Sequence, residues 1–440
     1  MILRIHSKPR KHTRFYGLIM LLTCLVFARY GLQIGVPRVL LTATIFLIAA
    51  LGDKNEILAV AMCCIPMHEA VDFSYALVAC AAIYALKYQQ DIRINFAVLL
   101  VLLIIFWELL HCFGPDFSLM SFLFPIVPLI FLAVLLCTDV SRIDYAFIVR
   151  VMTAATIVTC TALMINLFVR ANYQFASAVA ALQRLGQISK EELSDTAVGS
   201  AINPNSLGII CVLSLSGLLQ LRAVGQSRKS DIILMVIMLV LGSLTASRTF
   251  LVCLVIMAIL MILGQPGDIR KKIRLLAVFL ILLIVALILL NWLFTDLLEY
   301  YISRFQSDNI MSSRDTLMTA YHRYISENPA VMFFGIGRSN YNAKLTETYR
   351  IARNIPHNAV QEIVVAWGIP GLILFVLLCG MLIKQSGKYN RKHILLNYIP
   401  LLIILVKSMA GQVLTSLYTM LSLSYAYLSL CQNFRVKEER

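Results

Sequence analysis

Long apolar runs separated by short polar or charged connections recur along the whole chain. A run such as residues 275–294, LLAVFLILLIVALILLNWLF, has the length of about 20 residues that spans a bilayer. The runs lie near residues 15–29, 38–52, 57–67, 73–88, 94–112, 119–137, 145–169, 205–222, 231–246, 249–264, 273–294, 358–384, 394–412 and 414–431. This pattern predicts an all-α, polytopic transmembrane helical bundle of about 12–14 helices, because some short runs can merge into one helix.

The composition agrees with a membrane protein. Hydrophobic residues make up 60% of the 440 residues and charged residues 14%, whereas about 25% of a soluble globular protein is charged. The net charge of +15 comes largely from basic segments near residues 4–14, 222–231, 267–274 and 384–393. These segments fall on alternate sides of the apolar runs, which is the positive-inside pattern. We therefore expect both termini in the cytoplasm and no nucleic-acid partner.

The sequence predicts neither cleavage of a signal peptide nor disulfide bonds. The run follows a basic region as in a signal peptide, but no small-residue cleavage site follows it, so it is interpreted as the first transmembrane helix. All 11 cysteines lie in or at the ends of apolar segments. They are expected to be free thiols that serve as small hydrophobic side chains in the lipid phase or in the core.

Two long segments, 170–204 and about 295–357, face the outer side in this topology. Loops longer than about 15 residues are usually functional or disordered. The second loop contains a helix-like stretch, SSRDTLMTAYHRYISENP, which is followed by a GIG turn at residues 335–337. We expect a small helical subdomain here, with a cap at Ser312 or Ser313, apolar positions at Leu317, Tyr321 and Tyr324, and Pro329 beyond the helix end.

The second loop is also rich in arginine. Its seven basic residues, six of them arginine, are Arg304, Arg314, Arg323, Arg338, Lys344, Arg350 and Arg353. The planar guanidinium group suits phosphate and pyrophosphate better than an ammonium group does. Exposed ion pairs with the acidic residues of the same loop are the alternative explanation for most of them.

A polar cluster, PHNAVQEIVVAWGIPG (356–371), precedes and enters an apolar run. Pro356 suits the first turn of a helix, which puts His357 near a helix N-terminus that favours an anion. Asn358 and Glu362 are four residues apart, on one helical face. The glycines and proline of 368–371 are expected to kink the helix. An interfacial histidine without a chemical role is the alternative.

Two further polar features lie at predicted helix ends. Arg248 occupies a very short connection between two apolar helices, and an ionisable residue at membrane depth is a functional candidate by default. Simple snorkelling of its side chain to the interface is the alternative. The NPN sequence at 203–205 marks a helix start, with Asn205 as a fair N-cap.

Four blocks together resemble the O-antigen polymerase and O-antigen ligase superfamily: NPN (203–205), SR (247–248), SSRDTLMTAYHRYISENPAVMFFGIG (312–337) and PHNAVQEIVVAWGIPG (356–371). The last block is similar to the family's signature of His-Asn, Glu and two glycines. The order of the blocks predicts N-terminal transmembrane helices at 1–200 and a ligase- and polymerase-like core at 201–385, which includes the outer loop 295–357. C-terminal transmembrane helices and a cytoplasmic tail follow at 386–440.

The resemblance implies a membrane glycosyltransferase of the GT-C type on the outer face of the bacterial cytoplasmic (inner) membrane. Its donor would be a glycan carried on undecaprenyl pyrophosphate. By the same resemblance the catalytic residues are Arg248, Arg314 and His357. The substrate-binding candidates are Arg338, Arg353, Asn358, Glu362 and Asn205.

The residue types fit this chemistry. A pyrophosphate leaving group develops charge that must be stabilised, and a metal ion for that purpose needs clustered carboxylates. The sequence has no Asp-x-Asp pair, so we expect Arg248 and Arg314 to hold the pyrophosphate, without metal or cofactor. A histidine, with an ordinary pKa of about 6.5, suits the acceptor hydroxyl. His357 would position or deprotonate it in one inverting displacement.

The predicted function is a polysaccharide polymerase that joins repeat units of a capsule, exopolysaccharide or O-antigen. Its partners would be the lipid-linked oligosaccharide, the lipid bilayer, and chain-length regulator and flippase proteins. One alternative is a ligase that transfers finished glycan to another acceptor, and another is a lipid-linked oligosaccharide flippase or transporter. A flippase would line a membrane-buried cavity with charges, and the intramembrane candidates are few: Arg150, Glu108 and Lys407, the last without an assigned role.

Overall fold

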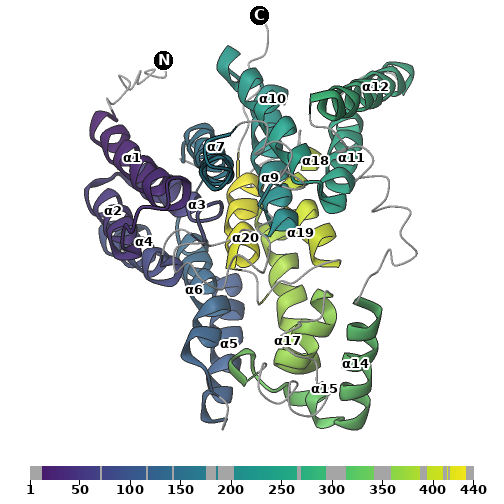
Figure 1. The fold of residues 1–440 in the computed structure, drawn as a ribbon. Coiled ribbons are helices and arrows are strands. Elements are labelled where there is room, and N and C mark those ends of the chain that lie inside the picture. The colour runs from purple at the N-terminus through teal and green to yellow at the C-terminus, as the bar shows by residue number, and fades with distance from the viewer. Residues whose placement is uncertain are drawn as a thin grey trace, which may run out of the picture.

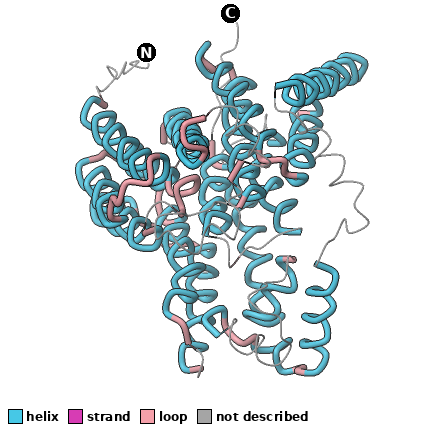
Figure 2. Tube along the Cα trace, viewed as in Figure 1, coloured by secondary structure: helices cyan, strands magenta, loops and turns pink. Residues whose placement is uncertain are grey.

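The computed structural model describes residues 12–69, 72–114, 117–140, 143–174, 185–186, 203–264, 269–293, 314–340, 358–386, 394–409, 414 and 417–432. Within this part of the chain all regular structure is helical (Figures 1 and 2). Among the described residues, six helices are long and apolar enough to cross a membrane, and shorter apolar helices accompany them. The prediction of an all-α, polytopic membrane bundle is confirmed.

The helices follow the apolar runs closely. The first 170 residues form α1 (Thr13–Val26), the π-helix η1 (Phe27–Gly31), α2 (Arg38–Leu51), α3 (Lys54–Cys63), α4 (Phe73–Lys87), η2 (Gln89–Asp91), α5 (Phe96–Leu110), η3 (His111–Phe113), α6 (Leu119–Leu136) and α7 (Tyr145–Arg170). The rest of the described chain forms α9 (Pro204–Ala223), α10 (Lys229–Leu244), α11 (Arg248–Leu263), α12 (Ile269–Leu293), α14 (Arg314–Glu327), α15 (Ala330–Phe334), η4 (Arg338–Asn340), α17 (Ala359–Ser386), α18 (Ile394–Asn397), α19 (Ile399–Met409) and α20 (Leu417–Leu430).

Large apolar side chains remain exposed along several of these helices. On α5, Leu102, Leu103 and Phe106 are each about half exposed, and on α12 the exposed fraction of Trp292 is 79%. A water-soluble monomer rarely leaves contiguous apolar patches of this extent uncovered. Lipid covers them in a multi-pass membrane protein. All eleven cysteines are free, as the sequence predicts.

The bundle has two distinct ends. Helices α14 and α15 lie together at one end, which we call the loop end (Figure 1). The starts of α1, α3 and α7 and the connection before α10 meet around one cavity, which we call the Arg150 end. The spanning helices connect the two ends, so residues far apart in sequence gather at each.

Small and polar residues hold the centre of the bundle together. The side chain of Gln220 on α9 donates to the backbone oxygen of Leu396 (2.6 Å) and to Ser429 Oγ (2.8 Å), and accepts from Tyr145 OH (2.7 Å). A polar group inside a bilayer is expensive unless it is hydrogen-bonded. Helix α19 packs against α9, α11, α17 and α20, so it links the α9–α11 region with α17.

Candidate active site at the loop end

The NPN and SR blocks lie side by side. The residues 245–247 join α10 to α11, and Ser247 Oγ accepts the N–H of Phe250 as the N-cap of α11 (3.3 Å). A methyl group placed on Gly208 in the first turn of α9 would lie 2.9 Å from Thr245 Oγ1 and 3.0 Å from Ser247 Cβ. The start of α9 therefore packs directly against the connection that carries Arg248.

The structure gives the two candidates from these blocks different positions. Arg248 is the first residue of α11 and is half-buried, in the short connection between apolar helices that the sequence indicates. Asn203, not Asn205, is the N-cap of α9, because its side-chain oxygen accepts the N–H of Asn205 (2.9 Å). The prediction of Asn205 as the cap is wrong; Pro204 takes the first helical position instead, where proline is well tolerated.

The loop helices form as predicted. Tyr321 and Tyr324 on α14 are buried, and Pro329 lies beyond the end of α14 as the N-cap of α15. Burial raises the pKa of Tyr324, so its phenol stays neutral. Arg314 is the first residue of α14; its side chain lies outside the described part, as do Ser312 and Ser313.

A buried carboxylate fixes the loop to the membrane helices. Glu108 on α5 is fully buried, and it accepts the backbone N–H groups of Arg338 and Ser339 (both 2.9 Å) and the indole N–H of Trp367 (2.6 Å). All three partners are donors, and an ionised carboxylate is an acceptor only. Such charge-assisted bonds are about twice as strong as neutral ones. Glu108 therefore joins α5, η4 and α17.

Backbone contacts extend this attachment. The N–H of Ile336 donates to Val365 O (2.9 Å) and that of Gly337 to Ala366 O (2.8 Å). Trp107 Nε1 on α5 donates to Trp367 O (2.9 Å), and a ring nitrogen of His111, the first residue of η3, lies 2.9 Å from Phe334 O. We call Glu108 together with residues 335–340 and 365–367 the loop anchor.

Glycines allow this close approach. Gly335 has φ +71°, and a methyl group there would lie 2.3 Å from Ala366 O. Gly368 has φ +68°, interrupts α17 and lies against the backbone of Phe333. Side chains rarely adopt positive φ, so both the GIG turn and the kink of α17 depend on glycine. Both features are confirmed.

Arg338, a substrate-binding candidate, belongs to the loop anchor. Its side chain is only 2% exposed, and its backbone N–H is bound to Glu108. The structure thus places Arg338 in the protein interior. Its interior position differs from that of Arg323 on α14, which is exposed and pairs with Glu327 at 2.7 Å.

The start of α17 differs in detail from the sequence prediction. The helix begins at Ala359, and Pro356, which the sequence suggests for its first turn, lies outside the described residues. Asn358 is the cap: its side-chain oxygen accepts the N–H of Val360 (2.9 Å) and lies 3.4 Å from that of Gln361. Asn358 therefore satisfies backbone donors that were expected to favour an anion. His357 and Arg353 lie outside the described residues.

Glu362, one turn into α17, is fully buried. Its Oε2 accepts the N–H of Leu414, between α19 and α20, at 3.2 Å. The neighbouring Gln361 donates to Met318 O on α14 at 3.4 Å. Glu362 and Gln361 thus connect the start of α17 to α14 on one side and to the α19–α20 connection on the other.

Lys407, which the sequence left without a role, lies close to this connection. It is 8% exposed near the end of α19; its ammonium group donates to Thr419 Oγ1 (2.5 Å) and lies 5.0 Å from the centre of the Tyr418 ring. The hydroxyl and the aromatic face offset part of the cost of burying the charge. In the sequence, Lys407 stands out because it is a lone ionisable residue within an apolar run.

The predicted site residues fall into two groups. One group, on α9 and α11, contains Asn205 and Arg248. The other group, around α17, contains Asn358, Glu362 and the start of α14, where Arg314 lies. Helix α19 packs against helices of both groups. Sequence reasoning named Glu108 only as an intramembrane charge. Its role in the attachment was missed, because its partners, two backbone N–H groups and the Trp367 indole, are more than 200 residues away.

The carboxylates of Glu108 and Glu362 at the loop end accept hydrogen bonds from protein donors. Glu108 and Glu362 each accept at least one backbone N–H. In the described part of the chain, one group of potential metal ligands has its donor atoms within 4.8 Å of one another: His12, Asp53 and Glu56. That group lies at the Arg150 end, far from the candidate site in sequence and in the bundle.

Residues 233–376 match a family model described as O-antigen ligase. No curated protein matches the chain. The matched region begins within α10 and ends within α17, so it contains the SR block, the loop, the loop anchor and the start of α17. All predicted site residues except Asn205 lie inside it.

Proposed function

We propose that this chain is a polysaccharide polymerase, because its residues 233–376 match a family model described as O-antigen ligase, a family of glycosyltransferase-like enzymes. It transfers a growing glycan from undecaprenyl pyrophosphate to the next lipid-linked repeat unit, on the outer face of the bacterial cytoplasmic membrane. The capsule, exopolysaccharide or O-antigen is the product.

One observation carries the proposal: the matched region contains site residues of both groups. It begins before Arg248 and ends beyond Glu362. Within it, the loop anchor ties the loop to α5 and α17, so the loop helices have a fixed position relative to the membrane helices. A transferase needs this arrangement, because donor and acceptor must be held in one geometry for the displacement.

The proposed reaction is a single displacement. The acceptor hydroxyl oxygen forms a bond to the anomeric carbon as the bond from that carbon to the pyrophosphate oxygen breaks, and the configuration inverts. His357 takes the hydroxyl proton. Arg248 and Arg314 balance the negative charge that develops on the lipid pyrophosphate, as fixed cations do at other developing oxyanions. Chain-length regulator and flippase proteins are the proposed protein partners.

Reconstitution tests the function directly. The purified chain in lipid vesicles should convert undecaprenyl-pyrophosphate-linked repeat units into a ladder of longer chains without a nucleotide sugar, because the lipid donor is already activated. Excess EDTA should leave the rate within about two-fold if arginines stabilise the pyrophosphate. Gel separation of the glycans measures both. Loss of the ladder with EDTA and its return with magnesium or manganese would falsify the assignment of Arg248 and Arg314.

A ligase is the second candidate, because the matching family model is described as O-antigen ligase. A ligase would transfer a preformed glycan once to a different acceptor and would yield no ladder in the same assay. Movement of the lipid-linked oligosaccharide across the vesicle membrane without any new glycosidic bond would support the flippase instead.

The orientation is tested by cysteine labelling. Ser326 is exposed on α14 and Ser230 is exposed at the start of α10. Ser326→Cys should react with an impermeant thiol reagent in intact spheroplasts, and Ser230→Cys only after permeabilisation. Cys24 is exposed in the native chain, so wild-type labelling gives the background. The reverse pattern would place the loop in the cytoplasm and end the proposal.

Replacement of Arg248 by lysine should lower polymer synthesis roughly 10- to 150-fold, the range for loss of a charge-assisted contact of about 1.5–3 kcal/mol. Lysine keeps the charge but loses the bidentate geometry. Initial rates in the vesicle assay measure the effect. Arg323→Lys is the matched control, because Arg323 is an exposed arginine paired with Glu327; its rate should not change. Full activity of Arg248→Lys would leave Arg248 as an interface residue only.

A further inference from the structure

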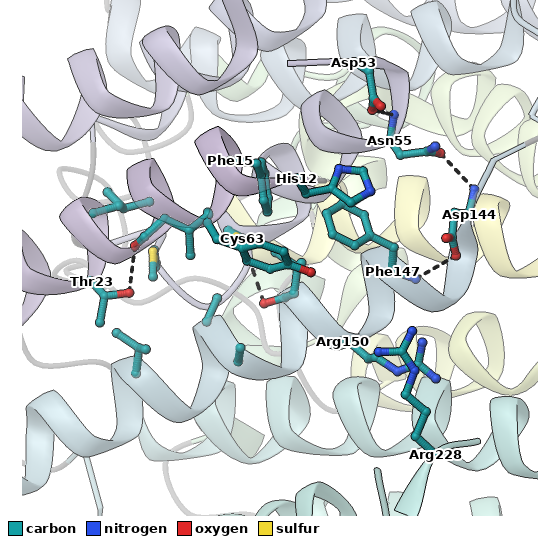
Figure 3. A pocket seen from close by; sticks show the side chains of 18 residues that line it. His12, Phe15, Thr23, Asp53, Asn55, Cys63, Asp144, Phe147, Arg150 and Arg228 are labelled. Carbon is teal, nitrogen blue, oxygen red and sulfur yellow. Dashed lines mark hydrogen bonds between the residues drawn. The ribbon is translucent and has the colours of Figure 1, made fainter. Parts of the chain in front are cut away.

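A large cavity lies at the Arg150 end, away from the candidate active site. Its volume is about 770 Å³, within the range of small-ligand sites. Helices α1, α3 and α7 line it, together with Arg228 from the connection between α9 and α10 (Figure 3). The proposed transferase reaction uses none of these residues.

One part of the cavity is apolar and elongated. Phe15, Ile19 and Leu22 of α1 line one side at helical spacing, and Val151, Ala155 and Val158 of α7 line the other. From Val151 to Val158 the axis of α7 rises about 10 Å at 1.5 Å per residue. One leaflet of a bilayer has a hydrocarbon depth of about half of 30 Å. The apolar part is therefore long enough for roughly the first two thirds of one acyl chain.

The other part of the cavity carries two arginines, Arg150 and Arg228. Figure 3 shows the side chains of Arg150 and Arg228 close together. Arg150 forms a bidentate pair with Asp231, through Nε (3.0 Å) and Nη2 (2.8 Å), and Asp231 also accepts the backbone N–H of Arg228 (2.8 Å). Asp231 is fully buried, whereas Arg228 is exposed. Asp231 therefore pairs with the guanidinium of Arg150 and binds the backbone of Arg228, so the exposed guanidinium of Arg228 adds its positive charge at the cavity.

The other ionisable groups at the cavity are already engaged. Asp53 accepts the N–H groups of Asn55 and Glu56 as the cap of α3, and Asp144 accepts that of Phe147 as the cap of α7 (2.9 Å). His12 binds the carboxylate of Glu56 at 2.7 Å and stacks on Phe147. The aspartates compensate helix N-termini, so they offset the arginine charge less than free carboxylates would.

We propose that this cavity binds an anionic phospholipid of the surrounding bilayer. The phosphate lies beside Arg228 and Arg150, and one acyl chain lies between α1 and α7. Arginine suits a phosphate ester because its fork can bind two oxygens. Helix α1 lies at the edge of the bundle (Figure 1), so the cavity behind it is next to the bilayer. The site is independent of the proposed function.

Photolabelling of the full-length protein tests the site. The probe is phosphatidylglycerol with a diazirine on one acyl chain, diluted into phosphatidylcholine vesicles that contain the protein; peptide mass spectrometry locates the label. In the wild type the label should fall on cavity residues of α1 and α7. Arg228→Gln should lower this labelling about five-fold, the effect of one basic residue near an anionic lipid surface. Ala154→Trp, which fills the apolar part, should remove it.

Two control variants separate the cavity from general effects. Arg222 is exposed near the end of α9 and Ile233 is exposed on α10, and neither lines the cavity. Arg222→Gln and Ile233→Trp should label like the wild type. The same diazirine on phosphatidylcholine should label the cavity about five-fold less than the anionic probe.

Three results would overturn the proposal. One is label confined to outward-facing positions such as those of α12 in the wild type. Another is unchanged labelling in Ala154→Trp. The third is equal labelling by both probes combined with unchanged labelling in Arg228→Gln. That result would mean that the cavity is an apolar crevice that does not recognise an anion. Arg228 is exposed, so its substitution tests the site even if the tryptophan variant does not fold.

Discussion

Replacement of His357 by alanine is expected to abolish polymer formation, with a fall in turnover of about 10²- to 10⁴-fold, the usual contribution of a general base. The residue immediately precedes Asn358, the cap of α17, whose side chain already satisfies the first-turn N–H groups. The helix start therefore does not depend on the imidazole, and the variant should fold. The ladder assay measures turnover, and protein recovered from the membrane fraction measures folding.

Two further variants separate the possible roles of this histidine. His357→Gln keeps a hydrogen-bonding side chain but cannot take a proton, so it should remain close to the alanine variant if His357 is the base. His322, exposed on α14 in the same loop, is the matched control, and His322→Ala should be fully active. Near-normal polymer from His357→Ala would remove it from the mechanism.

Replacement of Glu108 by alanine is expected to release the loop anchor and reduce polymer synthesis below detection. The variant leaves the buried N–H groups of Arg338, Ser339 and Trp367 without their acceptor. Each unsatisfied buried donor costs about 1–3 kcal/mol. The attachment of η4 to α5 and α17 should therefore open, and limited proteolysis should cut the loop faster than in the wild type. Protease protection and the ladder assay are measured on the same vesicles.

The Glu108 prediction has a conservative variant and a control. Glu108→Gln keeps the shape but turns one oxygen into a donor, so it should fall between alanine and the wild type. Gln385 lies at the other end of α17. There it donates to the side-chain oxygen of Asn95, the N-cap of α5 (3.1 Å). Gln385→Ala should leave the loop protected. A protease-resistant, fully active Glu108→Ala protein would show that the loop is held by other contacts.

Local patterns predicted much of this fold because they act over a few residues. Apolar runs of membrane length require helices, since no water is present to bind free backbone groups. The helix in the loop follows from the spacing of Tyr321 and Tyr324, and the turn and the kink follow from Gly335 and Gly368, because side chains rarely adopt positive φ. Helix caps were less predictable: Asn203 and Asn205 are equally good candidates by residue type, and only the backbone geometry distinguishes them.

Sequence alone therefore determined the helical bundle, the loop subdomain and the resemblance to the O-antigen ligase family, each of which depends on short blocks or on their order along the chain. Tertiary structure decided which polar residues serve the architecture. Glu108 and Arg338 are 230 positions apart, yet they form one buried attachment. Lys407 gained its partners, Thr419 and Tyr418, only through the pairing of α19 with α20. Such partners arise from helix packing, which depends on all the contacting surfaces together and leaves no mark in the local sequence.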